Sequence, residues 1–340
     1  MRKISKVVSF GTVATLAVTL GGCSTTTGTA TNGATNTISL TIGVPGQPPV
    51  FVNAVLYVAK AEGFFTNEGL DVTLRPFTTG ADVGRAVQSG EIVGGMVATP
   101  GAIALRANGG DVVGVYGFEH PSYLIGSTDG SMTSCKQLAG HTIAIDAAGA
   151  PKALALTAML ASCGLGPNDV STVAVGGPQT VDALVAGQVK QAVLHPDELA
   201  AVKSKVTANT VMTLASVAPL SHYTLIVTTR KQLTDPTAHE NWLKVVRATK
   251  KAIDFIVNPA NADKVAQVAS EMTTRAVSIT RPALADFLAI EFWPTGSPGL
   301  SRDRIEATVK GEVAAGNVTA ANAPTYEQLV DPSLYTTTTK

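Results

Sequence analysis

The sequence predicts an α/β protein in which helices cover both faces of parallel sheets. Short apolar strand candidates alternate with helix-length segments from residue 38 onward. The chain has 340 residues, of which 45% are hydrophobic, and this length is sufficient for two domains or two lobes. Charged residues make up only 15% and glycines number 32, which is typical of a compact protein with buried strands and tight loops.

Hydrophobic periodicity and bounding turn residues predict each element in order. Strand candidates are short apolar runs at residues 38–44, 71–74, 91–99, 112–118, 142–147, 170–175 and 191–195. Helix candidates lie between them at residues 53–62, 81–89, from 101 onward, 151–162 and 179–186. This alternation is typical of strand–helix–strand units, which build parallel sheets.

The stretch AEGFFTNEGLDVTL, residues 61–74, connects the first predicted helix to the second strand. Gly63 can adopt the left-handed conformation that ends a helix, and Gly69 can make a second turn. Phe64 and Phe65 supply apolar area where the chain turns back onto the sheet. We therefore interpret this segment as a packing device, and both phenylalanines as core residues rather than ligand contacts.

Residues 1–22 have the pattern of an export signal. Arg2 and Lys3 give a positive start, and the apolar run at 7–20 is shorter than the about 20 residues that a membrane-spanning helix needs. The run ends in Leu-Gly-Gly before Cys23, which resembles the bacterial lipobox, where a diacylglycerol alkylates the cysteine thiol. We expect lipidation at Cys23; the alternative is an ordinary signal peptide followed by an incidental cysteine.

Residues 23–37 are almost entirely Thr, Gly, Ala, Asn and Ser, so we expect a lipid-anchored flexible tether that holds the folded body off a membrane. Lys+Arg and Asp+Glu are both 25, and the neutral chain contains no basic block. This balance argues against nucleic acid as a partner.

Two cysteines remain in the body, Cys135 and Cys163. Outside the cytoplasm they can pair as a disulfide, and the alternative is two buried free thiols. The chain has no CxxC motif, so a zinc ribbon or a thioredoxin-like site has no support.

Five motifs follow one another along residues 38–335. They are YVAKAEGFFTNEGLDVTL, TTGADVGRAVQSGEIVGGMVATPGAIAL, CKQLAGHTIAIDAAGAPKALALTAMLASCGL, TVDALVAGQVKQAVLHPDE and PTYEQLVDPSLY. In this order they resemble one family, the solute-binding proteins of ABC importers for nitrate, sulfonates, taurine and thiamine precursors.

The resemblance implies a bilobed periplasmic-binding-protein-like fold of type II, with two parallel or mixed sheets joined by a two-crossing hinge. The expected boundaries are 38–119 and 223–340 for lobe 1, 124–218 for lobe 2, and 119–123 and 219–223 for the crossings. The resemblance also implies an exported monomer without a cofactor. Its partners would be a small solute, an ABC permease with its ATPase subunit, and a membrane reached through the lipid anchor.

Two positions depart from the family pattern. Family members commonly carry a hydroxyl residue just after the glycine that follows the first strand of lobe 2, whereas here Gly149 is followed by Ala150 and Pro151. An acidic residue is also common where this chain has Lys190-Gln191. The first departure leaves only backbone amides for a ligand at that loop.

Ligands of open α/β sheets bind beyond the carboxyl ends of the strands, where helix starts present free N–H groups. Hydroxyls and amides at such positions suit an anion or a carboxylate. For each threonine the alternative is a helix N-cap without a ligand role. The predicted contacts at these strand ends are Gln47, Thr78, Thr79, Thr99, Gly149 and Ala150.

Three of the five histidines fall at expected cleft positions, His120 and His222 at the crossings and His195 at a strand end. Glu119 lies beside His120 and completes the predicted ligand-binding set. We favour hydrogen bonding to a polar ligand; the alternatives are hinge hydrogen bonds and a metal site, although the spacing matches no metal motif. No metal is predicted.

The sequence lacks GxSxG, HExxH, P-loop and GxGxxG motifs, so we expect no enzyme. The loops favour a small polar or anionic solute such as a sulfonate. The alternatives are an aromatic or pyrimidine solute, an enzyme resembling thiamine-pyrimidine synthase, and a surface lipoprotein without a transport role.

Overall fold

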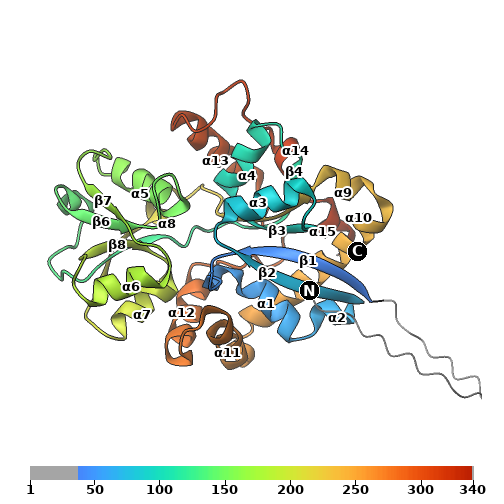
Figure 1. The fold of residues 1–340 in the computed structure, drawn as a ribbon, viewed down its shortest axis with the longest axis horizontal. Helices are drawn as coiled ribbons and strands as arrows, with labels where there is room; N and C mark the ends of the chain where they lie inside the picture. Colours follow the sequence, from blue (N-terminus) through green and yellow to red (C-terminus); the bar gives the residue numbers. More distant parts are fainter. Residues whose placement is uncertain (1–36, 339–340) are drawn as a thin grey trace, which may run out of the picture. The chain divides into compact units, whose positions relative to one another are not determined.

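The computed structural model describes residues 37–338, so the predicted signal peptide, Cys23 and nearly all of the predicted tether lie outside the described part. The described chain contains two five-stranded sheets (Figure 1). The first has the order β2-β1-β3-β10-β4. Its strands are β1 (Ile38–Pro45), β2 (Leu70–Phe77), β3 (Gly94–Ala98), β4 (Val112–Phe118) and β10 (Thr224–Thr229).

The second sheet has the order β7-β6-β8-β5-β9. Its strands are β5 (Leu124–Ser127), β6 (Thr142–Ile145), β7 (Ser171–Ala174), β8 (Gln191–Leu194) and β9 (Asn209–Thr213). The chain passes from the first sheet to the second between β4 and β5, and returns between β9 and β10.

Both sheets are mixed, because the strand that arrives from the other sheet runs against its neighbours. β10 is antiparallel to β3 and β4, and β5 is antiparallel to β8 and β9. The expectation of two parallel or mixed sheets is therefore confirmed in its mixed form, whereas strand–helix alternation alone gave no indication of these two antiparallel strands. Local periodicity does not carry strand direction, which depends on where the chain enters the sheet.

Helices cover both sheets (Figure 1). Along the first half of the chain they are η1 (Phe51–Asn53), α1 (Ala54–Ala61), α2 (Phe64–Asn67), α3 (Gly80–Ser89), α4 (Thr99–Ala107), η2 (Cys135–Leu138) and α5 (Pro151–Ala161). The following ones are α6 (Pro178–Val185), α7 (Pro196–Lys203), α8 (Leu214–Val217), α9 (Arg230–Thr234) and α10 (Pro236–Val257). The last are η3 (Pro259–Asn261), α11 (Ala262–Thr273), α12 (Val277–Ala289), α13 (Arg302–Ala314), α14 (Tyr326–Leu329) and α15 (Ser333–Thr338).

The segment after α1 packs as predicted. Gly63 adopts a left-handed conformation with φ 71°, and Gly69 makes the second turn with φ 75°. Phe65 is buried, and the ring of Phe64 packs edge-on against Phe255 of α10 with centroids 5.9 Å apart. Phe65 belongs to the main apolar core and the half-buried Phe64 packs against it, which confirms the interpretation of this segment as a packing device.

Several predicted elements differ in their bounds, and β2, for example, runs to Phe77 beyond the predicted 71–74. The strand expected at 91–99 is shorter, because β3 begins at Gly94 and Thr99 already starts α4. A Cβ on Gly94 would collide with ring atoms of Trp242, and one on Gly95 would lie 2.6 Å from the carbonyl of Gly43. The glycines therefore permit a close approach that larger residues would prevent.

Two further features concern the described residues. Cys135 and Cys163 form a disulfide, with Cα atoms 6.2 Å apart, that joins η2 to the end of α5. No described helix is both long enough and apolar enough to span a bilayer.

Candidate functional site

The carboxyl ends of parallel strands from both sheets meet the two crossings. Thr224, which starts β10, pairs with Ala98 at the end of β3 and with Phe118 at the end of β4. Leu124, which starts β5, pairs with Leu194 at the end of β8. The loops that follow these strand ends therefore lie beside the same pair of connections, where ligands of α/β sheets bind.

Four of the predicted residues lie in exposed loops after strands that run parallel to β3 or β8: Gln47 after β1, Thr78 and Thr79 after β2, and Gly149 after β6. Gln47 donates a hydrogen bond to the carbonyl of Pro76, 3.2 Å away. Gly149 has φ 73°, and Ala150, half-buried, follows it as the N-cap residue of α5. These side chains and amides remain open to solvent, as a ligand-contacting loop requires.

Thr79 is the N-cap of α3, which was the alternative to a ligand role. Its hydroxyl donates to Oδ2 of Asp82 at 2.7 Å and accepts from the backbone N–H of Asp82 at 3.2 Å. The Thr79 hydroxyl, together with Arg85, holds the pKa of Asp82 below its ordinary value. The cap satisfies one helix-start amide, and the exposed Thr79 keeps capacity for a second contact.

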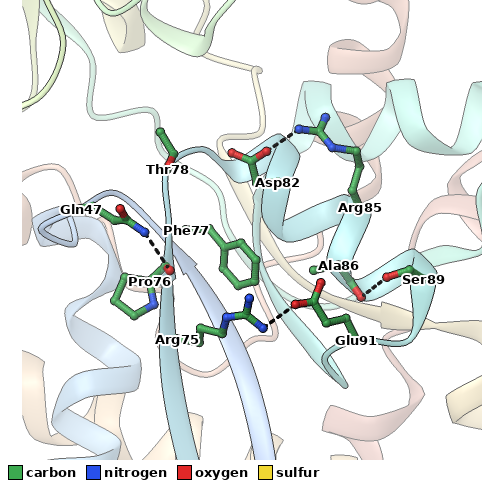
Figure 2. A pocket seen from close by; sticks show the side chains of 10 residues that line it. All are labelled: Gln47, Arg75, Pro76, Phe77, Thr78, Asp82, Arg85, Ala86, Ser89 and Glu91. Atoms are coloured by element: carbon green, nitrogen blue, oxygen red, sulfur yellow. Dashed lines mark hydrogen bonds and ion pairs between the residues drawn. The ribbon is translucent and has the colours of Figure 1, made fainter. Parts of the chain in front are cut away.

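A cavity of about 520 Å³ is lined by Gln47 and Thr78 and extends between β2 and α3 (Figure 2). Figure 2 shows Arg75 turned toward Glu91, 2.6 Å away, and Arg85 beside Asp82. The Arg75 guanidinium also lies over the Phe77 ring, 4.6 Å from its centroid. The lining residues are Gln47, Arg75, Pro76, Phe77, Thr78, Asp82, Arg85, Ala86, Ser89 and Glu91.

The structure thus brings the predicted Gln47 and Thr78 together in one cavity and adds two arginines that sequence reasoning missed. The alternation of side chains along β2 could have indicated one of these arginines, because Arg75 stands two residues before Phe77 and therefore lies on the same face of the strand. The cations are exposed and already paired with carboxylates. An anionic ligand would have to compete with these carboxylates.

Thr99 and His222 form a buried contact with each other. The carbonyl of Gly299 can only accept, so Nε2 of His222 donates to it at 2.8 Å, and Nδ1 accepts from the Thr99 hydroxyl at 2.7 Å. Burial lowers the pKa of His222 to about 4, which keeps the ring neutral. The two residues connect the start of α4 to the second crossing and have no exposed polar atom to offer a ligand directly.

His195 is also buried, at the end of β8. Its Nδ1 lies 2.9 Å from the hydroxyl of Ser122, and its ring packs on Tyr123 with centroids 4.6 Å apart. Tyr223 of the second crossing lies 6.4 Å from the same ring. Burial lowers the pKa of His195 to about 4. His195 therefore contacts both crossings, an arrangement suited to a pivot.

The remaining predicted residues, Glu119 and His120, contact the C-terminal part of the chain. Glu119 accepts a hydrogen bond from the backbone N–H of Ser301 at 2.8 Å and lies 3.7 Å from Arg304. His120 donates from Nδ1 to the carbonyl of Ile290 at 2.6 Å. These hinge hydrogen bonds are the alternative considered for the histidines, and ligand contact at both residues stays a prediction.

Sequence reasoning also missed two buried ion pairs at the first turn of α7. Nζ of Lys152 lies 2.9 and 2.8 Å from the two carboxylate oxygens of Glu198. Although burial alone would raise it, the Lys152 ammonium holds the pKa of Glu198 below its ordinary value. Asp197 pairs with Arg275 at 3.1 Å, and burial raises the pKa of Asp197 to about 6. Sequence spacing gives no signal for these partners.

The described residues contain no group of three or more His, Cys, Asp or Glu side chains that could hold a metal ion. What the arrangement can do chemically is offer helix-start amides, hydroxyls and guanidinium groups to a polar solute. Two α/β sheets whose strand ends face a shared pair of crossings define a bilobed, periplasmic-binding-protein-like fold of type II.

A protein-family model described as NMT1/THI5 like matches residues 51–262, and the chain belongs to this family. No curated protein matches the chain. Solved structures do. The alkanesulfonate-binding protein SsuA from Xanthomonas axonopodis pv. citri bound to MOPS is 16% identical with a TM-score of 0.68, covering 86% of this chain and 98% of its own.

Two other similar structures carry different descriptions. The periplasmic nitrate-binding protein NrtA from Synechocystis PCC 6803 is 13% identical with a TM-score of 0.68, and 88% of each chain is covered. A cysteine-to-serine mutant of DSZB in complex with biphenyl-2-sulfinic acid is 15% identical with a TM-score of 0.62, covering 89% of this chain and 99% of its own. At these identities the likenesses show the fold alone.

Proposed function

We propose that this chain is the solute-binding lipoprotein of an ABC import system. It captures a small polar or anionic organic solute, with a sulfonate favoured, and delivers it to a permease. The observation that carries the proposal is that the exposed loops after β1, β2 and β6 follow strands that run parallel to β3 or β8, whose carboxyl ends pair with the strands entering from the crossings. Membership of the NMT1/THI5-like family and likeness to sulfonate- and nitrate-binding proteins support it.

The preference for an anion has a physical basis. α3 and α5, of 10 and 11 residues, both begin at predicted ligand loops, and a helix start carries partial positive charge from its unpaired N–H groups. Arg75 and Arg85 line the cavity that adjoins Gln47 and Thr78. A sulfonate has three oxygen acceptors, so it can accept hydrogen bonds from several such donors at once.

Transport follows from a change in the angle between the lobes. The lobes would divide at the predicted boundaries, 38–119 and 223–340 against 124–218, and close on the solute by a hinge motion at the crossings. Burying the solute between the lobes favours the closed form, and a permease that prefers this form then receives the loaded protein. Lipidation at Cys23 would keep the exported protein at the membrane that holds the permease. The role involves binding without catalysis.

A pyrimidine or other aromatic solute is the second candidate. Trp293 is buried, and its Nε1 has no hydrogen-bond partner among the described residues. The rings of Phe51 and Trp293 lie 6.4 Å apart, next to Phe287. A heterocycle with a ring acceptor would satisfy the indole N–H, which is the reason to test this class too.

A thermal-shift screen separates the candidates. Purified protein is heated with aliphatic sulfonates, nitrate, carboxylates and aminopyrimidines, in a buffer that contains no sulfonate. A solute that binds only the folded state raises the melting temperature, and tighter binding raises it further. We expect the largest shift with a sulfonate. A shift with pyrimidines alone would replace the sulfonate by the second candidate, and no shift with any class would contradict the solute-binding role.

A further inference from the structure

The first turn of α7 is connected to four other parts of the chain. Its N-cap, His195, contacts both crossings through Ser122, Tyr123 and Tyr223. The next two charged residues point elsewhere: Glu198 pairs with Lys152 at the start of α5, and Asp197 pairs with Arg275. Arg275 lies in the connection between α11 and α12.

Arg275 belongs to the helical layer of the first sheet. α11 packs against α1 and η1, which follow β1, and α12 packs against α11. The connection is itself held in place, because the hydroxyl of Ser270 donates to the carbonyl of Arg275 at 2.5 Å, and Thr274 before it adopts a left-handed conformation with φ 57°. The guanidinium is thus presented from a fixed backbone.

Asp197 belongs to the second sheet's helical layer. α7 follows β8 directly, and its side chains Leu199 and Val202 join the apolar cluster on that sheet. Ile279 of α12 packs against the same cluster, and α12 lies alongside α7 (Figure 1). The Asp197–Arg275 pair and this apolar contact therefore join the helical layers of the two sheets, and with them the two predicted lobes, at a place away from the crossings.

Charge makes the pair more than a surface contact. The side chains of Arg275 and Asp197 are only 16% and 3% exposed, and Oδ1 of Asp197 has no hydrogen-bond partner among the described residues. Arg275 is consequently the main compensation for a buried carboxylate. Removing one partner of such a pair leaves an uncompensated buried charge, which strongly disfavours the conformation that buries it.

We propose that Arg275 is a positioning residue that latches α7 to the α11–α12 connection and thereby sets the angle between the two lobes. Loss of the guanidinium drives the lobes apart, because opening exposes the Asp197 carboxylate to water. The same turn of α7 holds Lys152, so the latch also acts on the loop at Gly149 and Ala150. The coupling to solute affinity rests on the proposed function, whereas the effect on the lobe angle does not.

The test measures distances between spin labels by double electron–electron resonance, without solute. Labels are placed through an unnatural amino acid, which spares the disulfide, at exposed Lys60 of α1 and Gln188 beyond α6. Arg275→Met should shift the distance distribution to longer values and broaden it. The matched control is Arg281→Met, because Arg281 of α12 pairs with Asp263 of the neighbouring helix α11 at the surface, within the helical layer of the first sheet. This variant should leave the distance distribution unchanged.

A double variant isolates the charge. In Asp197→Asn with Arg275→Met no buried carboxylate is left without a cationic partner, because Glu198 keeps its pair with Lys152, so the distance shift should be smaller than that of Arg275→Met alone. If Arg275→Met does not fold, the double variant and Arg275→Lys, which keeps the charge, still report on the latch. Folded Arg275→Met with the wild-type distribution, or an equal shift in Arg281→Met, would overturn the proposal.

The solute screen and the distance measurement can fail separately. With a solute in hand, Arg275→Met should weaken affinity about tenfold if one molecule in ten remains competent to bind. Absence of any binding solute would contradict the proposed function and leave the label distances as the test of the latch. A shifted distribution with unchanged affinity would overturn the link between the latch and the solute.

Discussion

The ammonium of Lys152 donates to both carboxylate oxygens of Glu198, at 2.9 and 2.8 Å, where the two side chains are 8% and 5% exposed. Oε2 of Glu198 also accepts from the backbone N–H of His195 at 2.8 Å. The pair therefore ties the loop after β6 to the loop after β8. These are the two loops of the second sheet at which we predict solute contacts.

Lys152→Met should destabilise the protein by about 3–5 kcal/mol, because it leaves the Glu198 carboxylate buried without its cation. Lys152→Met combined with Glu198→Leu should recover most of this loss, since neither charge then remains. The measurement is the free energy of unfolding in urea. A loss below about 1 kcal/mol in the single variant would mean that water reaches Glu198.

Acid should destabilise the protein through its buried histidines. The pKa of His222 is about 4 in the folded protein and near 6.5 when unfolded, so the unfolded chain takes up the proton first as the pH falls. The part of the unfolding free energy that depends on a neutral His222 ring is fully present above about pH 6.5. It is lost as the pH falls, and the loss levels off below about pH 4. A pKa difference of this size corresponds to about 3 kcal/mol.

The pH effect is measured by comparing wild type with His222→Gln, whose amide can still donate to the Gly299 carbonyl. Between pH 6.5 and 4 the wild type should lose more stability than the variant, even if the variant is less stable at pH 7. Parallel pH profiles would show that His222 is protonated without cost, contrary to its burial.

Reducing the Cys135–Cys163 disulfide should lower stability by about 3–4 kcal/mol on the chain-entropy account, since the bond closes a loop with a sequence separation of 28. The measurement compares unfolding of oxidised protein with that of Cys135→Ala/Cys163→Ala. Two titratable thiols in protein purified without reductant would instead show that the bond does not form in the cell.

The strand-end loops can be tested with whichever solute the screen finds. Gly149→Val should abolish binding while the protein stays folded, because the position has φ 73° and we predict that the solute approaches its amide closely. Thr79→Ala should weaken binding by about 1–2 kcal/mol and, as the N-cap of α3, also lower stability by about 1 kcal/mol. Calorimetric titration is the measurement, with His239→Ala as the control that changes nothing. Unchanged affinity in both loop variants would place the site on other loops.

The predicted lipid anchor falls on Cys23, which lies outside the described residues, and it is tested in cells. Cys23→Ser removes the thiol that a diacylglycerol would alkylate, so the protein should leave the membrane fraction or remain unprocessed. Fractionation followed by immunoblotting is the measurement. A variant that sediments with membranes as the wild type does would exclude lipidation at this cysteine.

Features that depend on neighbours in the chain could be predicted from the sequence. Gly63 ends α1 because its backbone tolerates a positive φ, and Thr79 caps α3 because its hydroxyl reaches an amide three residues later. Except at β5, β9 and β10, which it missed, the strand–helix alternation likewise predicts which segments form sheets, since it depends on periodicities of two and 3.6 residues. These choices are local, so the sequence by itself determined them.

Partners distant in the sequence were decided only by the tertiary structure. Nothing near Arg275 indicates that its guanidinium meets Asp197, and nothing near His222 indicates that Thr99 and Gly299 occupy both ring nitrogens. The direction of β5 and β10 belongs to the same class, because it depends on the side from which the chain enters each sheet. Burial then determines the charge state of these groups, since desolvation depends on the atoms that surround a side chain in space rather than on its neighbours in the chain.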